Sequence, residues 1–327
     1  MTFDAASYFD LGRSIPNGYY LRALRNSVIG NSNTLISTLV LMLTRQKSLL
    51  HLMAAAGRPV HRTELTKWSF LLRHGFPSRG GSAFYDFLPY RFGPFSFCLY
   101  QEADKLEQQG YIVQRGEHAW ELTGLKHPAP EQPVSRDIDA LVGEFLATPL
   151  DGLVEYVYQK FPAFTVHSER KKLAKRPRAC PAVYTAGYEG ESVDAFLNKL
   201  IVAGIERILD VRSNPIARRY GFHKSTLSRL AQKVQIDYVH LPELGIKSEL
   251  RRGLHENENY VELFSLYCAT TLRSERAAIE RVASRVQEKP SVLVCMEADP
   301  VCCHRSHLAK RVATFCKLPV VHIASSQ

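Results

Sequence analysis

The chain has 327 residues, of which 45% are hydrophobic and 23% are charged. These values are typical of a globular protein rather than a disordered or fibrous one, and the length allows two domains with separate cores. Lysine and arginine number 42 against 32 aspartates and glutamates, a net charge of +10. This excess favours an anionic partner, with nucleic acid ahead of a membrane surface.

The cysteines and the N-terminus indicate the compartment. Seven cysteines, an odd number without an evident pairing framework, predict a reducing environment. The N-terminal "MTFDAASYFDLGRS" has early acids and no basic region followed by an apolar one, so we expect no secretory signal. The run "TLISTLVLML" (34–43) is about half as long as a membrane span and reads as a buried helix. We therefore predict a cytoplasmic protein without membrane contact.

The N-terminal half has a helical pattern that ends in a hairpin. No role is assigned to the first thirty residues. A helical pattern then stops at Gly57 and Pro59, and a later one follows a Gly-Pro turn and leaves at Gly110 into a strand. The expected elements are helices at 33–56, 61–76 and 92–110 and a hairpin at 111–123. This order is that of a winged helix.

Two segments carry a resemblance to a known domain. "FYDFLPYRFGPFSFCLYQEADKLEQQGYI" and "LVEYVYQKFPAFTVHSERKK" resemble the winged-helix domain of an uncharacterised bacterial family and of some antitoxin-like proteins, over about residues 45–172. The helix that would enter DNA holds Glu102, Asp104 and Glu107 against Lys105, and acids repel phosphates. The resemblance therefore leaves two roles open, which are DNA contact through the wing or flanks and contact with protein.

A connector and a basic segment follow. "KHPAPEQPVSRD" (126–137) is rich in proline and precedes helices expected near 137–146 and 150–161. "HSERKKLAKRPR" (167–178) has six lysines and arginines in twelve residues. It is either a solvated linker or a hinge that contacts nucleic acid. The candidate DNA-binding residues are Lys171, Lys172, Lys175, Arg176 and Arg178. The predicted division is an extension at 1–44, a winged-helix-like domain with trailing helices at 45–166, a basic linker at 167–180 and a further domain at 181–327.

After Cys180, short apolar runs alternate with helical segments. "AVYTAG", "IERILDVR", "IDYVHL", "SVLVC" and "PVVHI" read as strands, and one long helix is expected near 258–285. This alternation predicts an α/β domain with a mainly parallel sheet flanked by helices on both faces. Four polar loops follow the first four strands: "GYEGE" (187–191), "DVRSNP" (210–215), "LPELG" (241–245) and "CMEADPVCCHR" (295–305). Because ligands bind at the carboxyl ends of such strands, we expect these loops to form one cleft.

The same segments carry a second resemblance. "YTAGYEGESVDAFLNKL", "DVRSNPIARRYGFHKSTL", "YVHLPELG" and "CMEADPVCCHRSHLA" resemble the DUF488 family, small bacterial and archaeal α/β proteins named for their unknown function. The resemblance spans about residues 182–323. It implies the fold and a polar cleft, and leaves the chemistry to be argued from the residues.

Five residues of these loops are candidates for catalysis. Asp210 and Arg212 lie two apart at a strand end, so they share a face, and the arginine would keep the carboxylate ionised. Together with Glu297 from another strand, Asp210 could do general acid–base work or stabilise a developing cation. The alternative is an Asp–Arg pair that braces the turn. Tyr188 either stacks on a planar ligand or packs in the core, and Glu189 beside it completes the set.

A second group of residues suits phosphate. His304 and Arg305 open the last helix, where backbone N–H groups and the helix dipole favour an anion. The other candidates for substrate or phosphate binding are Lys224, Arg218, Arg219 and Asn214. The alternative is a solvated basic surface.

The cysteines raise the question of a metal or redox site. Cys295, Cys302, Cys303 and His304 contain no C-x-x-C pair, and adjacent ligands at 302 and 303 would fit one tetrahedral site awkwardly. Cys295 ends a buried strand, where cysteine is commonly an apolar filler. We predict that the site uses its charges and needs no metal or other cofactor, with zinc and thiol chemistry as the lesser alternatives.

These features predict an enzyme that acts on nucleic acid. Metal-dependent strand cleavage is disfavoured because the sequence lacks a dense acidic cluster such as D-x-D. Hydrolysis of an N-glycosidic bond needs a carboxylate and a pocket for a flipped base. The expectation is therefore a hydrolase like a DNA glycosylase, acting on a modified base in defence against foreign DNA. The alternatives are a non-catalytic DNA-binding regulator that senses a nucleotide or small anion, and a thiol, redox or zinc enzyme.

Overall fold

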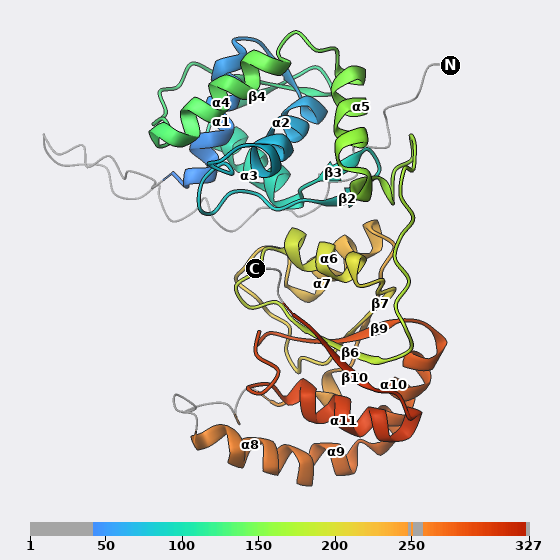
Figure 1. Ribbon diagram of the computed structural model, residues 1–327. Coiled ribbons are helices and arrows are strands. Elements are labelled where there is room, and N and C mark those ends of the chain that lie inside the picture. The colour runs from blue at the N-terminus through green and yellow to red at the C-terminus, as the bar shows by residue number, and fades with distance from the viewer. Residues whose placement is uncertain (1–41, 248–249, 251–257, 325–327) are drawn as a thin grey trace, which may run out of the picture. The chain divides into compact units, whose positions relative to one another are not determined.

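The computed structural model describes residues 42–247, 250 and 258–324 (Figure 1). Most of the apolar run at 34–43, and the start of the helix expected from residue 33, lie outside these residues. Among the helices that are described, none has the length and apolar character to cross a membrane.

Three helices and a small antiparallel sheet form the first part of the described chain. The helices are α1 (Thr44–Ala56), α2 (Arg62–Gly75) and α3 (Phe97–Gln108), and the strands β1 (Val60–His61), β4 (Ile112–Arg115) and β5 (Ala119–Leu122) pair in the order β1-β5-β4. Gly57 ends α1 in the left-handed conformation, with φ 63°, and Ser96 caps α3 by accepting a hydrogen bond from the amide of Leu99. These elements match the expected helices and hairpin closely.

Two details near this sheet differ from the sequence expectation. The Gly-Pro pair expected as a turn lies in strand β3 (Gly93–Phe95), which pairs with β2 (Leu88–Tyr90). Helix α4 (Gln132–Phe145) begins about five residues earlier than expected, because Pro133 occupies its first turn, where no amide donor is needed. Helix α5 (Leu150–Lys160) lies where it was expected.

The second part is an α/β layer with five parallel strands. The strands are β6 (Val183–Gly187), β7 (Arg207–Asp210), β8 (Asp237–His240), β9 (Ser291–Cys295) and β10 (Val320–Ile323), in the order β10-β6-β9-β7-β8. All residues of β6, β7 and β9 are buried, as continuous apolar runs predict for the centre of a parallel sheet. The predicted α/β class is confirmed.

Helices cover both faces of this sheet (Figure 1). Helices α6 (Val193–Val202) and α7 (Lys224–Lys233) lie on one face, and α10 (Arg276–Glu288) and α11 (His304–Cys316) lie on the other. The single helix expected near 258–285 is instead α8 (Glu258–Ala269), α9 (Thr271–Ser274) and α10. The first break falls at Thr270, a β-branched residue with a low helix propensity.

Carboxylates join the two parts of the described chain: Asp86 accepts a hydrogen bond from the Ser192 hydroxyl at 2.7 Å, and Asp194 makes the larger set of contacts. Asp194, in the first turn of α6, accepts hydrogen bonds from the Ser96 hydroxyl (2.9 Å) and from the amides of Phe97 (2.8 Å) and Cys98 (2.9 Å). Burial raises the pKa of Asp194 to about 6. The start of α3 is therefore buried against α6 and bonded to it, and this end of the helix is closed to a DNA groove.

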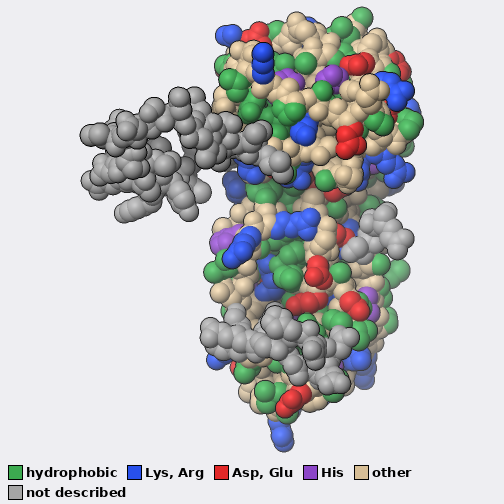
Figure 2. Space-filling model, turned by 90° about the vertical axis from the view of Figure 1, so that its left-hand side faces the viewer, with side chains coloured by type: hydrophobic (Ala, Val, Ile, Leu, Met, Phe, Trp, Pro, Cys, Tyr) green, Lys and Arg blue, Asp and Glu red, His purple; other side chains and the backbone are tan. Residues whose placement is uncertain are grey.

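The surface is mixed in charge. On the face drawn in Figure 2, lysine and arginine side chains lie among acidic and apolar ones rather than in one continuous patch. Among the described residues of this face, therefore, no single basic patch marks a binding surface.

Candidate functional site

The ends of the adjacent strands β6, β9 and β7 bring three of the four predicted loops together. Gly187 of β6 pairs with Cys295 of β9, and Asp210 of β7 pairs with Val294. A side-chain carbon on Gly187 would lie 1.8 Å from the carbonyl oxygen of Glu297, so this position needs glycine. We call the loops 187–191, 210–215 and 295–305 the carboxyl rim. All five predicted catalytic residues lie on it.

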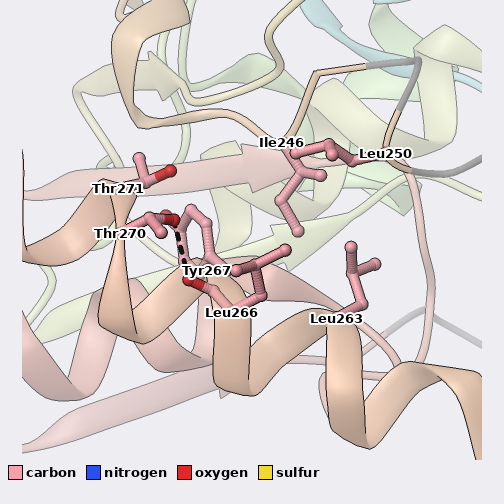
Figure 3. A pocket seen from close by; sticks show the side chains of 7 residues that line it. All are labelled: Ile246, Leu250, Leu263, Leu266, Tyr267, Thr270 and Thr271. Atoms are coloured by element: carbon pink, nitrogen blue, oxygen red, sulfur yellow. Dashed lines mark hydrogen bonds between the residues drawn. The ribbon is translucent and has the colours of Figure 1, made fainter.

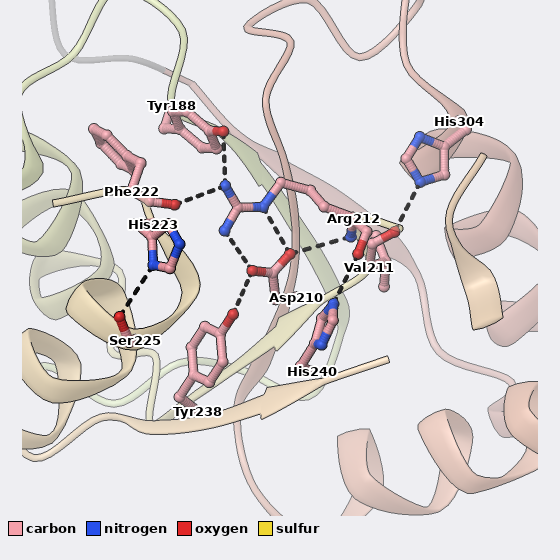
Figure 4. A network of polar contacts seen from close by, with 10 residues as sticks. All are labelled: Tyr188, Asp210, Val211, Arg212, Phe222, His223, Ser225, Tyr238, His240 and His304. Atoms are coloured by element: carbon pink, nitrogen blue, oxygen red, sulfur yellow. Dashed lines mark hydrogen bonds and ion pairs between the residues drawn. The ribbon is translucent and has the colours of Figure 1, made fainter. Parts of the chain in front are cut away.

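At its centre is a buried network around Arg212 (Figure 4). The guanidinium donates to both carboxylate oxygens of Asp210, at 2.8 Å from Nε and 2.5 Å from Nη2. Its Nη1 donates to the Tyr188 hydroxyl (2.8 Å) and to the carbonyl of Phe222 (2.9 Å). The Tyr238 hydroxyl donates to Asp210 at 2.5 Å. Asp210 is 0% exposed and Arg212 is 5% exposed, so this ion pair is closed to solvent.

The electrostatics of the pair favour a bracing role. Burial alone would lower the pKa of Arg212, but its hydrogen bonds to Asp210 and the charge of that carboxylate outweigh burial, and the pKa is raised. Burial and the charge of Asp210 also raise the pKa of Tyr238. A carboxylate that accepts hydrogen bonds on both oxygens and is shielded from solvent is poorly placed to take a proton from water. This geometry fits the alternative interpretation, in which the pair braces the turn after β7.

Tyr188 is also buried, and its ring and its hydroxyl both have partners within the protein. Its ring stacks on Phe222, with centroids 4.1 Å apart and planes 10° apart, and only 6% of the residue is exposed. Burial raises the pKa of its hydroxyl. The geometry again fits the alternative, core packing, because both ring and hydroxyl already have partners.

Other predicted site residues, on the carboxyl rim and just beyond it, are exposed to solvent. Glu189 is exposed, and its Oε2 accepts a hydrogen bond from the amide of Ala298 at 3.1 Å. Arg219 donates to the carbonyl of Gly190 at 3.2 Å, which places its guanidinium beside the Glu189 loop. The exposed candidates for substrate or phosphate binding are Asn214, Arg218, Arg219 and Lys224. Glu189 is therefore the one exposed carboxylate among the predicted catalytic residues.

His304 and Arg305 differ from this outer group. They are 2% and 1% exposed. The Arg305 guanidinium donates to the carbonyls of Glu297 and Ala298, and His304 Nε2 donates to the carbonyl of Val211 at 3.2 Å. Both side chains are thus bonded to the rim's backbone, where they fix the loop between β9 and α11, and they are not presented to a phosphate.

Four potential ligand groups converge beneath that loop. One ligand atom each of Cys295, Glu297, Cys303 and His304 lies within 4.8 Å of the others. Cys302 is not part of this group, and its thiol approaches Asp299 instead. The sequence pattern suggests Cys302, rather than Glu297, as the ligand beside Cys295, Cys303 and His304. The missed signal is a strand-end C-x-E followed by a Cys-His at a helix start.

The two buried thiols affect each other. A hydrogen bond from Cys303 lowers the pKa of Cys295 well below its usual value, against the effect of burial, and His304 acts in the same direction. Burial and the neighbouring Cys295 raise the pKa of Cys303 well above its usual value. Burial, with the Cys295 charge adding to it, also raises the pKa of Glu297. The pKa values of the two thiols are therefore shifted in opposite directions.

A small apolar pocket lies near this group, in the layer of α8 (Figure 3). Tyr267 borders it, and the ring of Tyr267 also meets His304 edge-on with centroids 5.4 Å apart. The other residues that line it are Ile246, Leu250, Leu263, Leu266, Thr270 and Thr271. None of the predicted site residues borders this pocket, so it is not the predicted cleft.

The basic segment is mostly accessible. Lys171, Lys172, Lys175 and Arg178 are exposed, and Lys171 pairs with Glu155 at 3.2 Å. Arg176 differs, because it donates to the carbonyls of Ile205 (2.5 Å) and Gln235 (3.2 Å), and burial lowers its pKa. Arg176 therefore fastens the segment to the α/β layer, and four of the five predicted DNA-binding residues remain at the surface.

The fold and the rim define a parallel α/β domain whose polar loops gather at the strand ends. Residues 192–312 match the family model described as "Domain of unknown function DUF488". The chain thus contains a DUF488 domain, from the start of α6 into α11, and the resemblance is confirmed over these residues. No curated protein and no solved structure matches the chain.

Proposed function

We propose that the protein is a hydrolase that acts on DNA and cleaves the N-glycosidic bond of a modified base at the carboxyl rim. The observation that supports this most is the exposed carboxylate of Glu189 among exposed cations. A carboxylate at this position can stabilise the oxocarbenium-like centre that develops as such a bond breaks. Its hydrogen bond from Ala298 orients it without removing it from solvent.

Exposed cations next to the carboxyl rim suit the phosphates that flank a flipped nucleotide. Arg218 and Arg219 follow the rim loop 210–215, and Lys224, the first residue of α7, donates its amide to the carbonyl of Pro215 in that loop. The exposed lysines and arginine of the basic segment extend the set of phosphate contacts. Such contacts supply affinity that does not depend on sequence.

We further propose that the winged-helix-like domain, residues 45–166, contacts DNA through its wing or flanks. Glu102 is 1% exposed and is paired with Arg45 at 2.8 Å, so it is internal, whereas Asp104 is exposed on α3. The start of α3 is also bonded to Asp194. The β4–β5 hairpin is the proposed wing, and Arg115 at its exposed end, which pairs with Glu121, would have to exchange that partner for a phosphate.

A second candidate function is a DNA-binding regulator that senses a small anion. The burial of Asp210, Arg212 and Tyr188 favours it, because it leaves Glu189 as the one predicted catalytic group in open contact with solvent. Such a regulator would use the exposed rim cations for its ligand and would turn over no substrate.

The experiment that separates the two is incubation of the full chain with plain DNA and with naturally modified, heavily substituted DNA. A probe for the aldehyde of abasic sites measures base loss, and a denaturing gel measures nicks. The proposed hydrolase produces abasic sites on a modified DNA. Binding without base loss on any of the DNAs would favour the regulator.

A further inference from the structure

Cys295, Glu297, Cys303 and His304 form a cluster that the proposed function does not use. The Cys295 Sγ lies 3.6 Å from His304 Nδ1, and the Cys303 Sγ lies 3.9 Å from the same nitrogen and 3.0 Å from an oxygen of Glu297. Two sulfurs, one imidazole nitrogen and one carboxylate oxygen thus surround a single point.

The backbone of the domain, rather than contacts among these side chains, holds the four groups in place. Cys295 is the last residue of the central strand β9, Cys303 is the N-cap of α11, and His304 is the first residue of that helix. Glu297 lies in the loop between them, and Arg305 binds the carbonyls of Glu297 and Ala298 to fold this loop back over the cluster. The arrangement therefore depends on secondary structure and a buried arginine rather than on flexible side chains.

The histidine is oriented as a ligand. Its Nε2 donates to the carbonyl of Val211, which leaves the lone pair of Nδ1 directed at the two thiols. A second ring nitrogen bonded to a backbone carbonyl is the usual support of a metal-binding histidine. Tyr267 packs edge-on against the ring and helps to fix its plane.

We propose that Cys295, Cys303, His304 and Glu297 bind one zinc ion in a tetrahedral structural site. Zinc prefers four ligands of this kind, with bonds of about 2.3 Å to sulfur and about 2.0–2.2 Å to nitrogen or oxygen. Tetrahedral angles between such bonds separate a sulfur from a nitrogen by about 3.6 Å, which matches the two sulfur–nitrogen distances. The Cys303–Glu297 contact is a hydrogen bond of 3.0 Å and would open by about 0.6 Å when zinc replaces its proton.

The site has a structural consequence for the rim. The chain between Cys295 and Cys303 contacts the loop at 187–191 twice. The carbonyl of Met296 accepts hydrogen bonds from the amides of Tyr188 and Glu189. The amide of Ala298 donates a hydrogen bond to the Glu189 carboxylate. A zinc ion would pin this segment at both ends. This inference does not depend on the reaction proposed above, because it concerns binding and stability alone.

The test is metal content of the full-length protein after incubation with zinc and removal of free ions. The wild type is expected to retain about one zinc per chain, and its cobalt form is expected to show a thiolate-to-cobalt charge-transfer band. Cys303→Ser and His304→Gln should each lose most of the metal. The matched control is Cys302→Ser, which changes the neighbouring thiol outside the cluster and should retain it. Circular dichroism checks that each variant is folded.

Three results would overturn the proposal. One is wild-type protein that holds no metal above the level of Cys303→Ser, and another is equal loss of metal in Cys302→Ser. The third is a Cys295–Cys303 disulfide in protein purified without reductant, found by mass spectrometry after alkylation, together with absence of the cobalt band after reduction. If Cys303→Ser does not fold, the cobalt spectrum of the reduced wild type and the comparison of His304→Gln with Cys302→Ser decide the matter.

Discussion

Replacing Asp210 by asparagine tests whether the buried ion pair holds the sheet together. The carboxylate accepts four hydrogen bonds, from Nε, Nη2 and the backbone amide of Arg212 and from the Tyr238 hydroxyl. Asparagine is nearly the same size but carries no charge, and its amide group presents a donor where the carboxylate presents an acceptor. The arginine would remain buried without a counter-charge.

The expected loss of stability is large. Tyr188 and Phe222 still offer oxygens to the Arg212 guanidinium, but neither is an anion. Removing one partner of a buried ion pair costs about 3–5 kcal/mol. Asp210→Asn should therefore lower the free energy of opening of the α/β layer by about that amount.

Hydrogen exchange measured by mass spectrometry is the suitable assay, because it follows peptides from β7 and β9 directly. Both tryptophans, Trp68 and Trp120, lie in the first part of the chain and would not report on this sheet. The control is Glu280→Gln, which breaks the exposed pair with Arg276 and should change stability by under about 1 kcal/mol. If Asp210→Asn changes the protection of β7 and β9 by no more than Glu280→Gln does, the buried ion pair does not hold the sheet together.

Two other predictions use the buried lysine and the basic segment. Burial lowers the pKa of Lys67 to about 7, below its unfolded value of 10.5, so stability should fall as pH drops from 10.5 towards 7. Between these pH values, the difference in the free energy of unfolding between the wild type and Lys67→Met should change by about 1.4 kcal/mol per pH unit. Urea unfolding followed by tryptophan fluorescence measures it, and a difference that does not change with pH would contradict the prediction. Replacing the four exposed basic residues by glutamine should weaken binding to all DNA sequences alike and reduce the slope of log K against log salt by about three to four. An unchanged slope would mean that the segment is only a linker. The four residues to be replaced are Lys171, Lys172, Lys175 and Arg178.

The sequence predicted the α/β layer because its strongest signals are local. Continuous apolar runs such as "SVLVC" identify central parallel strands, and polar loops after them identify the rim. The order of the strands in the sheet could not be predicted from these signals, because no local sequence feature places β9 between β6 and β7. The breaks that separate α8, α9 and α10 were missed because no glycine or proline lies between residues 258 and 285.

The burial of the rim's charged residues could not be predicted for a different reason. A residue at a strand end has the same sequence context whether solvent or another loop covers it. Asp210 and Arg212 are closed off by Tyr238 and Phe222, which come from later segments. The position of Glu297 beside Cys303 depends on Arg305 holding the loop backbone, a contact that no spacing rule reveals.

The most direct test of the proposed function is single-turnover base release by Glu189→Gln on a modified DNA that the wild type depurinates or depyrimidinates. The variant keeps the size of the side chain and one acceptor for the amide of Ala298, but it loses the negative charge. Carboxylate contributions of about 100- to 10,000-fold are typical, so the rate of abasic-site formation should fall by at least about 100-fold while DNA affinity is unchanged. A rate for Glu189→Gln within about threefold of the wild type, well short of that loss, would contradict the account.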